Sequence, residues 1–348
     1  MIKKLFLALL ILVCLSISAF SFAQKKEYQI HAFAFYNLEN LFHPSNDPNK
    51  FDDDFTPTGS YRYTEAIYQK KLHNMAYALS QIAIDKIPGG PALIGVAEVE
   101  NEQVLQDLIA QPELEKRKLR IVHFDSPDSR GIDVALLYQP QYFKVFHAKA
   151  LPVPLIENGR KIRTRDVLYI MGKLGNDTIH VLVNHWPSRF GGEEVSSWKR
   201  EKAAAVNREV IDSLVNLNPN VKIIVMGDLN DDPNNASITR TLGAVGTISK
   251  LKSGGLYNPW MSFHKKGLGT LAYKDNWNLF DQIIVSYGFI KAKSDGWKYQ
   301  SAEIFNKKFL LTQFGKFKGY PHRSYSGTKW IDGYSDHLPA IIYLIKKL

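Results

Sequence analysis

The sequence predicts an α/β fold in which two mainly antiparallel or mixed sheets pack face to face with helices on the outside. About ten short runs are rich in Val, Ile, Leu and aromatic residues, and only three runs show helical periodicity. So few helices cannot cover both faces of one large parallel sheet. The short polar turns Gln139-Pro140 and Gly175-Asn176-Asp177 also favour antiparallel neighbours. A single doubly wound sheet is the alternative architecture.

The predicted strands recur along the whole chain, and each is bounded by polar or turn-forming residues. They lie at Ile30–Asn37, Ala92–Glu98, Arg120–Phe124, Asp133–Tyr138, Tyr142–Lys149, Val167–Lys173, Thr178–Asn184, Val221–Gly227, Leu279–Ser286 and Ala340–Leu344.

Three segments have the apolar spacing of helices. The first is Tyr63–Ile84, where large apolar residues recur every three or four positions. The second is Glu102–Ile109, and Asn101 is placed to cap its start. The third runs from Val195 to Leu217 through a stretch of three alanines.

The first residues have the layout of a secretory signal peptide. Lys3 and Lys4 precede an apolar run from Leu5 to Phe20, and Ser21-Phe22-Ala23 offers small residues at the cleavage spacing. An N-terminal membrane anchor is the alternative, but the run is shorter than a spanning helix needs. We therefore expect residues 1–23 to be removed and the protein to be secreted or periplasmic. Residues 24–348 are then expected to form one catalytic domain.

Composition narrows the possible chemistry. The only cysteine, Cys14, lies in the predicted signal peptide, so a disulfide, a thiolate metal site and a cysteine nucleophile are all excluded from the mature chain. The formal net charge of +10 favours attraction to polyanions. No later apolar run is long enough to span a membrane, so we expect no stable membrane association and a monomeric protein.

Polar side chains of a restricted kind lie at the ends of five of the predicted strands, where the first four groups follow a strand and the fifth precedes the last one. They are Asn37, Glu98, Asn184-His185, Asp228-Leu229-Asn230 and Ser335-Asp336-His337. One such terminus is ordinary turn chemistry, because Asn and Asp are common turn residues. Five of them predict one shared rim, if the strands run in a common direction.

An oxygen-rich set without thiolate selects a hard cation, with Mg²⁺ expected and Mn²⁺ or Ca²⁺ as alternatives. Glu98 and Asp336 are the candidate carboxylate ligands, and Asn37 is a neutral oxygen ligand nearby. Histidine is suited to proton transfer near neutral pH, and Asp281 is a candidate to orient it.

Some residues support two interpretations. Arg163 and Arg165 suit a bidentate phosphate clamp, as does Arg189, but each also suits a solvated surface position. Asp133 either supports the site or caps a strand. Asn184 and the two arginines at 163 and 165 are the expected substrate contacts.

The segment from Ser286 to Gly333 is dense in Lys and aromatic residues. Basic side chains contact phosphates and aromatic rings stack on bases, so the segment suits a nucleic-acid groove. The alternative is a long connection whose aromatic rings pack onto the core.

Seven ordered blocks carry a resemblance to a known family. They are Phe35-Tyr36-Asn37-Leu38-Glu39-Asn40, Gly95-Val96-Ala97-Glu98-Val99-Glu100-Asn101, Arg130-Gly131-Ile132-Asp133-Val134-Ala135, Asn184-His185-Trp186, Gly227-Asp228-Leu229-Asn230, Asp281-Gln282-Ile283-Ile284 and Ser335-Asp336-His337-Leu338-Pro339. Together they resemble the endonuclease/exonuclease/phosphatase superfamily, which includes pancreatic-type DNases, AP endonucleases, bacterial sphingomyelinases and inositol polyphosphate phosphatases. The resemblance covers the mature chain.

The resemblance implies a four-layer α/β sandwich and a role for each matching position. Asn37 and Glu98 resemble the metal-binding pair, with Asp336 as a further carboxylate. His337, oriented by Asp281, resembles the histidine that activates water. Asp228 and Asn230 resemble the pair that positions nucleophile and phosphate. His185 resembles a second catalytic histidine, which AP endonucleases lack.

The sequence therefore predicts a metal-dependent phosphodiesterase, with nucleic acid as the expected substrate and an endonuclease as the expected activity. A phospholipase C-type enzyme or a sugar-phosphate phosphatase is the alternative on the same scaffold. A lipid enzyme needs an exposed apolar loop, for which Tyr257–Met261 is the candidate. A non-catalytic binding module is a further alternative, although the expected catalytic residues are all present.

Overall fold

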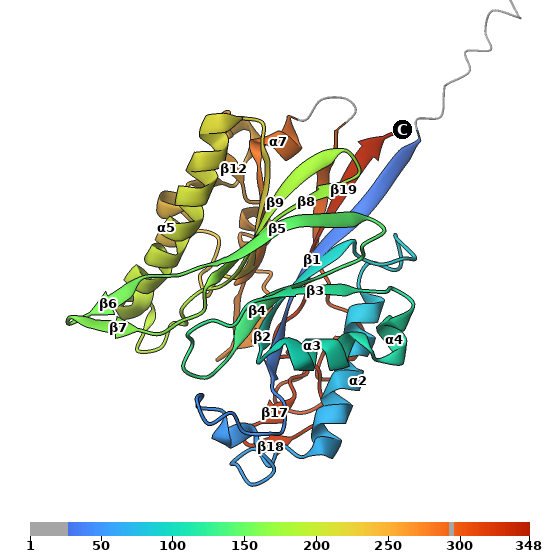
Figure 1. The fold of residues 1–348 in the computed structure, drawn as a ribbon, viewed down its shortest axis with the longest axis vertical. Helices are drawn as coiled ribbons and strands as arrows, with labels where there is room; N and C mark the ends of the chain where they lie inside the picture. The colour runs from blue at the N-terminus through green and yellow to red at the C-terminus, as the bar shows by residue number, and fades with distance from the viewer. Residues whose placement is uncertain (1–26, 292–295) are drawn as a thin grey trace, which may run out of the picture.

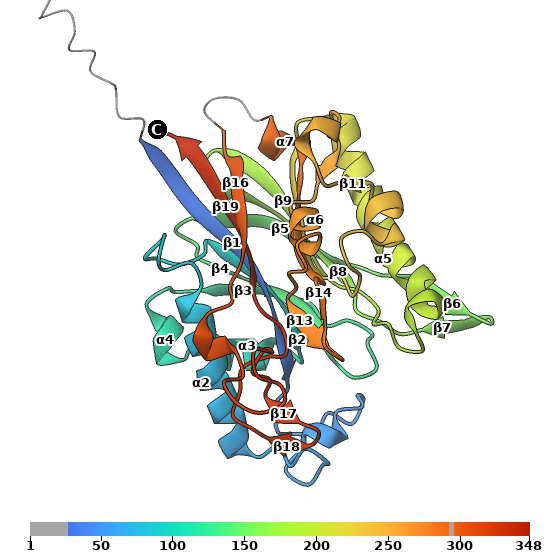
Figure 2. The ribbon, with the colours of Figure 1, turned by 180° about the vertical axis from the view of Figure 1, so that it is seen from behind.

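The computed structural model describes residues 27–291 and 296–348, so the predicted signal peptide lies outside the described residues. The chain forms two large sheets with helices on both outer sides, as Figures 1 and 2 show. The prediction of two packed sheets is confirmed, and the single doubly wound sheet is excluded.

The first sheet has six strands. In spatial order they are β16 (Lys298–Ile304), β19 (Ala340–Lys347), β1 (Tyr28–Leu41), β2 (Leu93–Val99), β4 (Asp133–Tyr138) and β3 (Arg120–His123). The second sheet has seven strands. They are β11 (Ala244–Val245), β12 (Leu256–Tyr257), β15 (Asp281–Ser286), β10 (Lys222–Asp228), β9 (Asp177–His185), β8 (Val167–Leu174) and β5 (Phe143–Leu151).

Three small hairpins and several helices complete the fold. The hairpins are β6–β7 (Leu155–Glu157, Arg160–Ile162), β13–β14 (Leu271–Tyr273, Asn276–Asn278) and β17–β18 (Tyr325–Ser326, Lys329–Trp330). The α-helices are α2 (Glu65–Gln81), α3 (Glu102–Ile109), α4 (Pro112–Glu115), α5 (Glu193–Leu217), α6 (Trp260–His264) and α7 (Tyr287–Ile290). Single helical turns lie at η1 (Asp53–Phe55), η2 (Ser237–Thr241), η3 (Ile248–Lys250) and η4 (Lys308–Leu310).

The side chains of β1 show why the sheets pack on both faces. Ala34 and Tyr36 belong to the core between the first sheet and α2, whereas Phe33 and Phe35 belong to the core between the two sheets. Successive side chains of a strand point to opposite faces, so an unbroken apolar run fills two layers at once. A third core lies between the second sheet and α5. Three apolar layers between four layers of structure give the α/β sandwich.

In each sheet, two strands that are neighbours run in the same direction because a helix connects them. β1 and β2 are parallel and joined through α2, and β9 and β10 are parallel and joined through α5. The three predicted helices are present, and Asn101 caps α3 by accepting from the Val104 N–H at 3.1 Å.

One predicted connection is different in the structure. The turn at Gln139-Pro140 does not join antiparallel neighbours, because β4 and β5 belong to different sheets. The side chain of Gln139 is 1% exposed and donates to the carbonyl oxygens of Gly89 and Pro91. It therefore fixes the chain where it passes from one sheet to the other. The turn Gly175–Asp177 does join the antiparallel strands β8 and β9.

The sequence did not predict β16, an edge strand of the first sheet. Its seven residues, KYQSAEI, are mostly partly buried and include several polar side chains. An edge strand with this composition lacks the continuous apolar run by which the other strands were recognised. Among the described residues, no helix combines the length and apolar character that crossing a bilayer requires.

Stability is expected to fall between pH 6.5 and pH 4 because of His31. This residue is 5% exposed, with ring centroids 4.7 Å from Tyr142 and 4.9 Å from Trp297, and burial lowers its pKa to about 4. Below pH 6.5 the imidazole is protonated in the unfolded chain but stays neutral in the folded protein. The free energy of unfolding therefore falls by about 2–3 kcal/mol by pH 4.5. Urea unfolding at pH 7 and pH 4.5 measures this loss.

The matched variant is His31→Gln, which removes the titrating ring. It should lose less stability than the wild type over the same pH interval, by about the same 2–3 kcal/mol. An identical pH dependence in the two proteins would contradict this assignment.

Candidate active site

The site is built around the carboxylate of Asp228, the last residue of β10. β10 lies between β9 and β15, and the register places His185 and Asp281 directly across from Asp228. Asn37, on β1 of the other sheet, donates from Nδ2 to Asp228 Oδ2 at 3.1 Å. The ends of strands from both sheets therefore converge on one rim, as the sequence predicted. Asp228 is 2% exposed, so its charge must be balanced by neighbouring groups.

The local backbone explains the motif Gly227-Asp228-Leu229-Asn230. A Cβ at Gly227 would lie 2.2 Å from the carbonyl oxygen of Asn184, so only glycine allows β9 to approach this closely. Asn230 has a φ of 48°, a left-handed conformation that asparagine tolerates well. Its N–H donates to Asp228 Oδ1 at 3.0 Å, and its Nδ2 donates to the carbonyl oxygen of Trp186 at 2.9 Å. This turn fixes Asp228 against the end of β9.

His337 lies in the segment before β19 and is paired with Asp281. Its Nδ1 is 2.7 Å from Asp281 Oδ2, and its Nε2 is 3.8 Å from Asp228 Oδ2. Ser335 positions the segment: its hydroxyl donates to the carbonyl oxygen of Asn37 at 2.7 Å and accepts from the His337 N–H at 3.1 Å. Because the carboxylate of Asp281 engages Nδ1, Nε2 is the ring nitrogen available for proton transfer.

Glu98 reaches the site through an irregularity in β2. The pairing of β2 with β4 shifts between Ala97 and Val99, and Glu98 has a φ of 60°. Such an irregularity re-aims a side chain that regular alternation would place elsewhere. Glu98 Oε2 accepts from the Asn40 N–H at 3.0 Å, while Oε1 lies 3.8 Å from His185 Nε2. Oε1 is thus beyond hydrogen-bonding distance of that ring and is available to another partner.

The three buried central groups have shifted pKa values. Burial raises the pKa of Asp228 to about 6, against the opposing effect of His337. Burial disfavours the His337 imidazolium, but the carboxylates of Asp281 and Asp228 outweigh it and hold its pKa well above the usual value. Burial, reinforced by Arg165, holds the pKa of His185 well below its usual value. The two histidines therefore differ in basicity, with His337 the stronger base and His185 the weaker one.

The oxygen donors at this rim fit a divalent cation. Glu98 Oε1 and the amide oxygen of Asn37 are hard ligands, and the chain offers no thiolate outside Cys14. Asp228, Asp281 and His337 also place possible ligand atoms within 4.8 Å of one another. The carboxylate of Asp336, in contrast, is 36% exposed and lies 3.0 Å from Nη2 of Arg323. Asp336 therefore faces an arginine that belongs to none of the sequence motifs.

Two of the predicted substrate contacts have other partners. Arg165 is 7% exposed: Nη1 donates to Asp128 at 2.9 Å, while Nε and Nη2 donate to the carbonyl oxygens of His185 and Trp186. Its guanidinium is committed to holding the end of β9 and is not free to clamp phosphate.

Asn184 is fully buried and fully hydrogen-bonded. Its Nδ2 donates to the carbonyl oxygens of Leu182 and Met226, and its Oδ1 accepts from Trp186 Nε1 and Asn207 Nδ2. It braces β9 and β10 from inside and does not reach substrate. Arg163 is exposed after β7, where a substrate contact remains a prediction.

A buried ionic network beside the site was not predicted. Glu39 is 6% exposed, and burial together with Asp336 raises its pKa to about 7. Its oxygens accept from the Ser324 N–H at 2.7 Å and from Arg323 Nε at 3.4 Å. Lys71 of α2, with no exposed surface, donates to the Ser324 hydroxyl at 2.6 Å. Glu39 is part of the block around Asn37, but nothing in the sequence pairs that block with residues 323 and 324.

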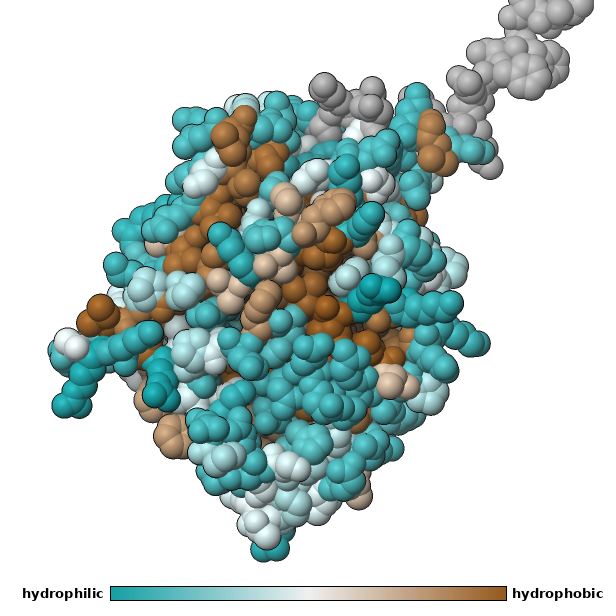
Figure 3. Space-filling model, in the orientation of Figure 1, coloured by the Kyte–Doolittle hydropathy of each residue, from teal (hydrophilic) through white to brown (hydrophobic). Residues whose placement is uncertain are grey.

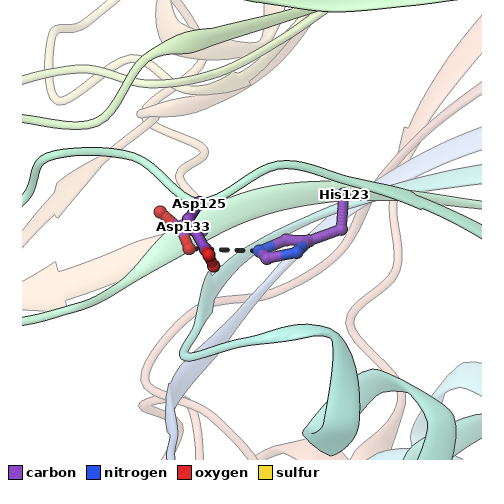
Figure 4. Close-up of side chains that lie close together, drawn as sticks. All are labelled: His123, Asp125 and Asp133. Atoms are coloured by element: carbon purple, nitrogen blue, oxygen red, sulfur yellow. Dashed lines mark hydrogen bonds and ion pairs between the residues drawn. The ribbon is translucent and has the colours of Figure 1, made fainter. Parts of the chain in front are cut away.

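A second acidic cluster lies between β3 and β4 (Figure 4). His123 Nε2 is 3.1 Å from Asp133 Oδ2, and Asp125 lies beside them. Asp133 Oδ1 accepts from the Ser126 N–H at 2.9 Å. Both oxygens of Asp133 are thus used to hold the connection between the two strands. Of the two interpretations of Asp133, the structure favours the one that fixes a strand end.

The basic and aromatic segment after Ser286 packs largely onto the core. Trp297 and Phe305 are 1% and 2% exposed, and Trp297 Nε1 donates to the carbonyl oxygen of Leu174 at 3.0 Å. Phe314 and Phe317 are 86% and 52% exposed. The described part of the segment therefore forms no single aromatic surface, and the packing alternative holds for its largest rings.

Comparisons with known proteins agree with this geometry. The model of the Endonuclease/Exonuclease/phosphatase family matches residues 32–346. TDP2 from D. rerio, solved in a complex with a single-strand DNA product, has a TM-score of 0.53 at 13% identity, with 91% of this chain and 99% of that chain covered. A search of curated protein sequences returned no match.

Two structures from Bacteroides thetaiotaomicron are similar in fold. An endonuclease/exonuclease/phosphatase family protein has a TM-score of 0.53 at 14% identity, covering 92% of this chain and 100% of its own. A mannosyl-6-phosphatase has a TM-score of 0.52 at 14% identity, covering 90% of this chain and 99% of its own. The family match spans nearly the whole described chain and includes every strand end at the rim. The protein belongs to the endonuclease/exonuclease/phosphatase family and is a phosphoesterase of that family.

Proposed function

We propose that the protein is a metal-dependent phosphodiesterase that cleaves nucleic acid as an endonuclease, outside the cytoplasm, after loss of residues 1–23. The observation that carries the chemical part is the buried pair of His337 and Asp281, 2.7 Å apart, with its free nitrogen facing Asp228. A histidine held between two carboxylates is a strong proton acceptor, and both carboxylates stabilise the imidazolium that forms.

Each group at the rim then has a separate task. His337 Nε2 takes the proton of the attacking water, and Asp281 holds the ring in the orientation that this requires. Asp228 and Asn230 position the water and the phosphate. His185, kept neutral by burial, donates a hydrogen bond to a phosphoryl oxygen. Glu98 and Asn37 would hold the divalent cation, with Asp336 as a further carboxylate. When bound, a divalent cation neutralises phosphoryl charge and that of the leaving oxygen.

Nucleic acid as the substrate is supported by charge and by a relative. The formal net charge of the chain is +10, and a TDP2 structure of the same fold contains a single-strand DNA product. A phospholipid enzyme has less support, because Tyr257–Met261 does not form an exposed loop tip. Trp260 is fully buried and donates to the carbonyl oxygen of Ile283 at 3.0 Å.

The other exposed apolar side chains are separated in sequence, such as Phe190, which is 91% exposed in the loop after β9. The β6–β7 hairpin projects from the molecule (Figure 1). It exposes Ile156, at 66%, as a single apolar side chain among charged ones. The lower half of the molecule in Figure 3 is predominantly hydrophilic. Isolated exposed apolar residues are normal on soluble surfaces and do not define a membrane-binding patch.

A substrate panel tests the proposal. Residues 24–348 should nick supercoiled plasmid in Mg²⁺, lose the activity in EDTA and regain it when Mg²⁺, Mn²⁺ or Ca²⁺ is restored. The panel includes a single-stranded oligonucleotide, sphingomyelin and mannose 6-phosphate. Robust hydrolysis of either of the last two, with plasmid and oligonucleotide intact, would overturn the nuclease proposal and leave the family assignment in place.

A further inference from the structure

A small cavity opens beside the candidate active site. It has a volume of about 210 Å³, and we call it the Tyr61 pocket. Its lining includes Glu39, Asn40, Phe55, Tyr61, Arg323 and Tyr325. The residues come from the end of β1, from the loop before α2 and from the start of the β17–β18 hairpin. These segments are distant in sequence and meet at the lower end of the molecule in Figure 1.

The pocket adjoins the residues proposed to hold the cation. The Asn40 N–H donates to Glu98 Oε2 at 3.0 Å, and the Glu39 N–H donates to Asn37 Oδ1 at 2.9 Å. Arg323, which also lines the pocket, lies 3.0 Å from the carboxylate of Asp336. A substrate whose phosphate lies at the rim therefore has its next chemical group within reach of this cavity.

Aromatic rings held by packing form one wall. The rings of Phe55 and Tyr61 are stacked, with centroids 4.4 Å apart and planes 8° apart. The ring of Phe42 also stacks on Phe55, with centroids 4.4 Å apart. The rings of Tyr325 and Tyr61 meet edge to face, with centroids 5.0 Å apart. Rings that are already packed lose little conformational entropy when a ligand binds. The wall is thus a preformed surface for a flat apolar face.

Polar groups with unused bonding capacity complete the lining. Arg323 uses Nε and Nη2 on Glu39 and Asp336, which leaves its Nη1 for a ligand as far as the described residues show. The Tyr325 hydroxyl is buried and, within residues 27–291 and 296–348, has no hydrogen-bond partner. The side chain of Tyr325 is 6% exposed, and a buried hydroxyl of this kind is normally paired. The cavity therefore offers an aromatic face together with donors and acceptors at its edge.

This combination selects a planar heterocycle. Nucleobases are bound by stacking on aromatic side chains or guanidinium planes and by hydrogen bonds to their edges. A choline head group would suit the aromatic rings and Glu39, but the guanidinium of Arg323 repels a cation. We propose that the Tyr61 pocket binds the nucleobase of the nucleotide whose phosphate lies at the active site. The inference rests on the proposed function and specifies its substrate class.

Calorimetric titration with three small probes tests the pocket without turnover. Adenosine 5′-monophosphate and ribose 5-phosphate differ only in the base, and phosphocholine represents the lipid alternative. The wild type, in Mg²⁺ and in EDTA, should bind adenosine 5′-monophosphate about tenfold more tightly than ribose 5-phosphate, as base stacking allows. Tyr61→Ala should abolish that preference, and Tyr61→Phe should retain it.

Two further variants separate stacking from folding. Tyr61→Leu keeps apolar bulk without a planar ring and should lose the preference while it remains folded. Tyr28→Ala is the matched control, because Tyr28 is 50% exposed at the opposite end of β1, and it should bind as the wild type does.

Equal binding of the two ribose phosphates to the wild type would overturn the inference. So would a preference that survives in both Tyr61→Ala and Tyr61→Leu, or tighter binding of phosphocholine. The result is separable from the proposed function. If the protein prefers the probe with a base but does not cleave plasmid, the pocket proposal is supported and the nuclease proposal is not. If it cleaves plasmid without that preference, the nuclease proposal is supported and the pocket proposal is not.

Discussion

Replacing His337 by glutamine will lower kcat for phosphodiester hydrolysis by about 10²–10⁴-fold, the usual contribution of a positioned acid or base. Glutamine keeps much of the shape and hydrogen-bonding capacity of the ring but cannot accept a proton from water. KM should change much less, because Nε2 acts on the attacking water. Steady-state kinetics in saturating Mg²⁺ on a fluorescent oligonucleotide measures the change.

The controls separate proton transfer from folding. His147 is an exposed histidine on β5, and His147→Gln should leave kcat within about twofold of the wild type. Asp281→Asn should lower kcat as well, because the amide no longer stabilises the imidazolium at Nδ1. If His337→Gln were folded and retained wild-type kcat, the assignment of His337 as the base would be wrong.

Replacing Glu98 by glutamine will have its largest effect on the dependence of activity on metal. The Glu98 carboxylate is negatively charged, and its Oε2 accepts from the Asn40 N–H. Its Oε1 is 3.8 Å from His185 Nε2, too far for a hydrogen bond, and is therefore available to a cation. Glutamine keeps the size and a neutral oxygen but removes the charge that attracts a divalent cation. We expect the Mg²⁺ concentration for half-maximal activity to rise by about 100-fold. This is the upper end of the loss in metal affinity seen when residues that support metal ligands are mutated.

The same titration compares the other acidic groups. Asp336→Asn should shift the Mg²⁺ requirement less than Glu98→Gln does, because the Asp336 carboxylate is paired with Arg323 and 36% exposed. Asp133→Asn, in the second acidic cluster, should leave the requirement unchanged, since both Asp133 oxygens hold protein groups. A larger shift for Asp336→Asn than for Glu98→Gln would make Asp336 the principal ligand.

Local sequence determined the secondary elements and the residues at their ends. Strands such as β1 and β10 were recognisable because both of their faces are buried, which demands an unbroken apolar run. The helix α3 was recognisable from its period and its cap at Asn101. The edge strand β16 was missed, because a partly buried strand carries polar residues and has no such run.

The sequence also identified the polar residues that meet at the rim, because each lies at or near one end of a predicted strand. Asn37, Glu98, His185, Asp228, Asp281 and His337 lie within a few ångströms of at least one other member of this group. The register of the strands explains this proximity. Once two strands are paired, the residues that the register places opposite each other lie side by side.

Only the tertiary structure decided which polar side chains face solvent, substrate or one another. Arg165 and Asn184 have the residue types of substrate contacts, yet their hydrogen bonds are all made inside the protein. Arg323 lies 284 positions from Glu39 in sequence, and they share one ionic network because the β17–β18 segment folds back onto the end of β1. The hydrogen bonds of a side chain depend on the neighbours that folding brings to it. The sequence therefore determined which chemical groups lie at the rim, and the tertiary structure decided the hydrogen-bond partners of each polar side chain.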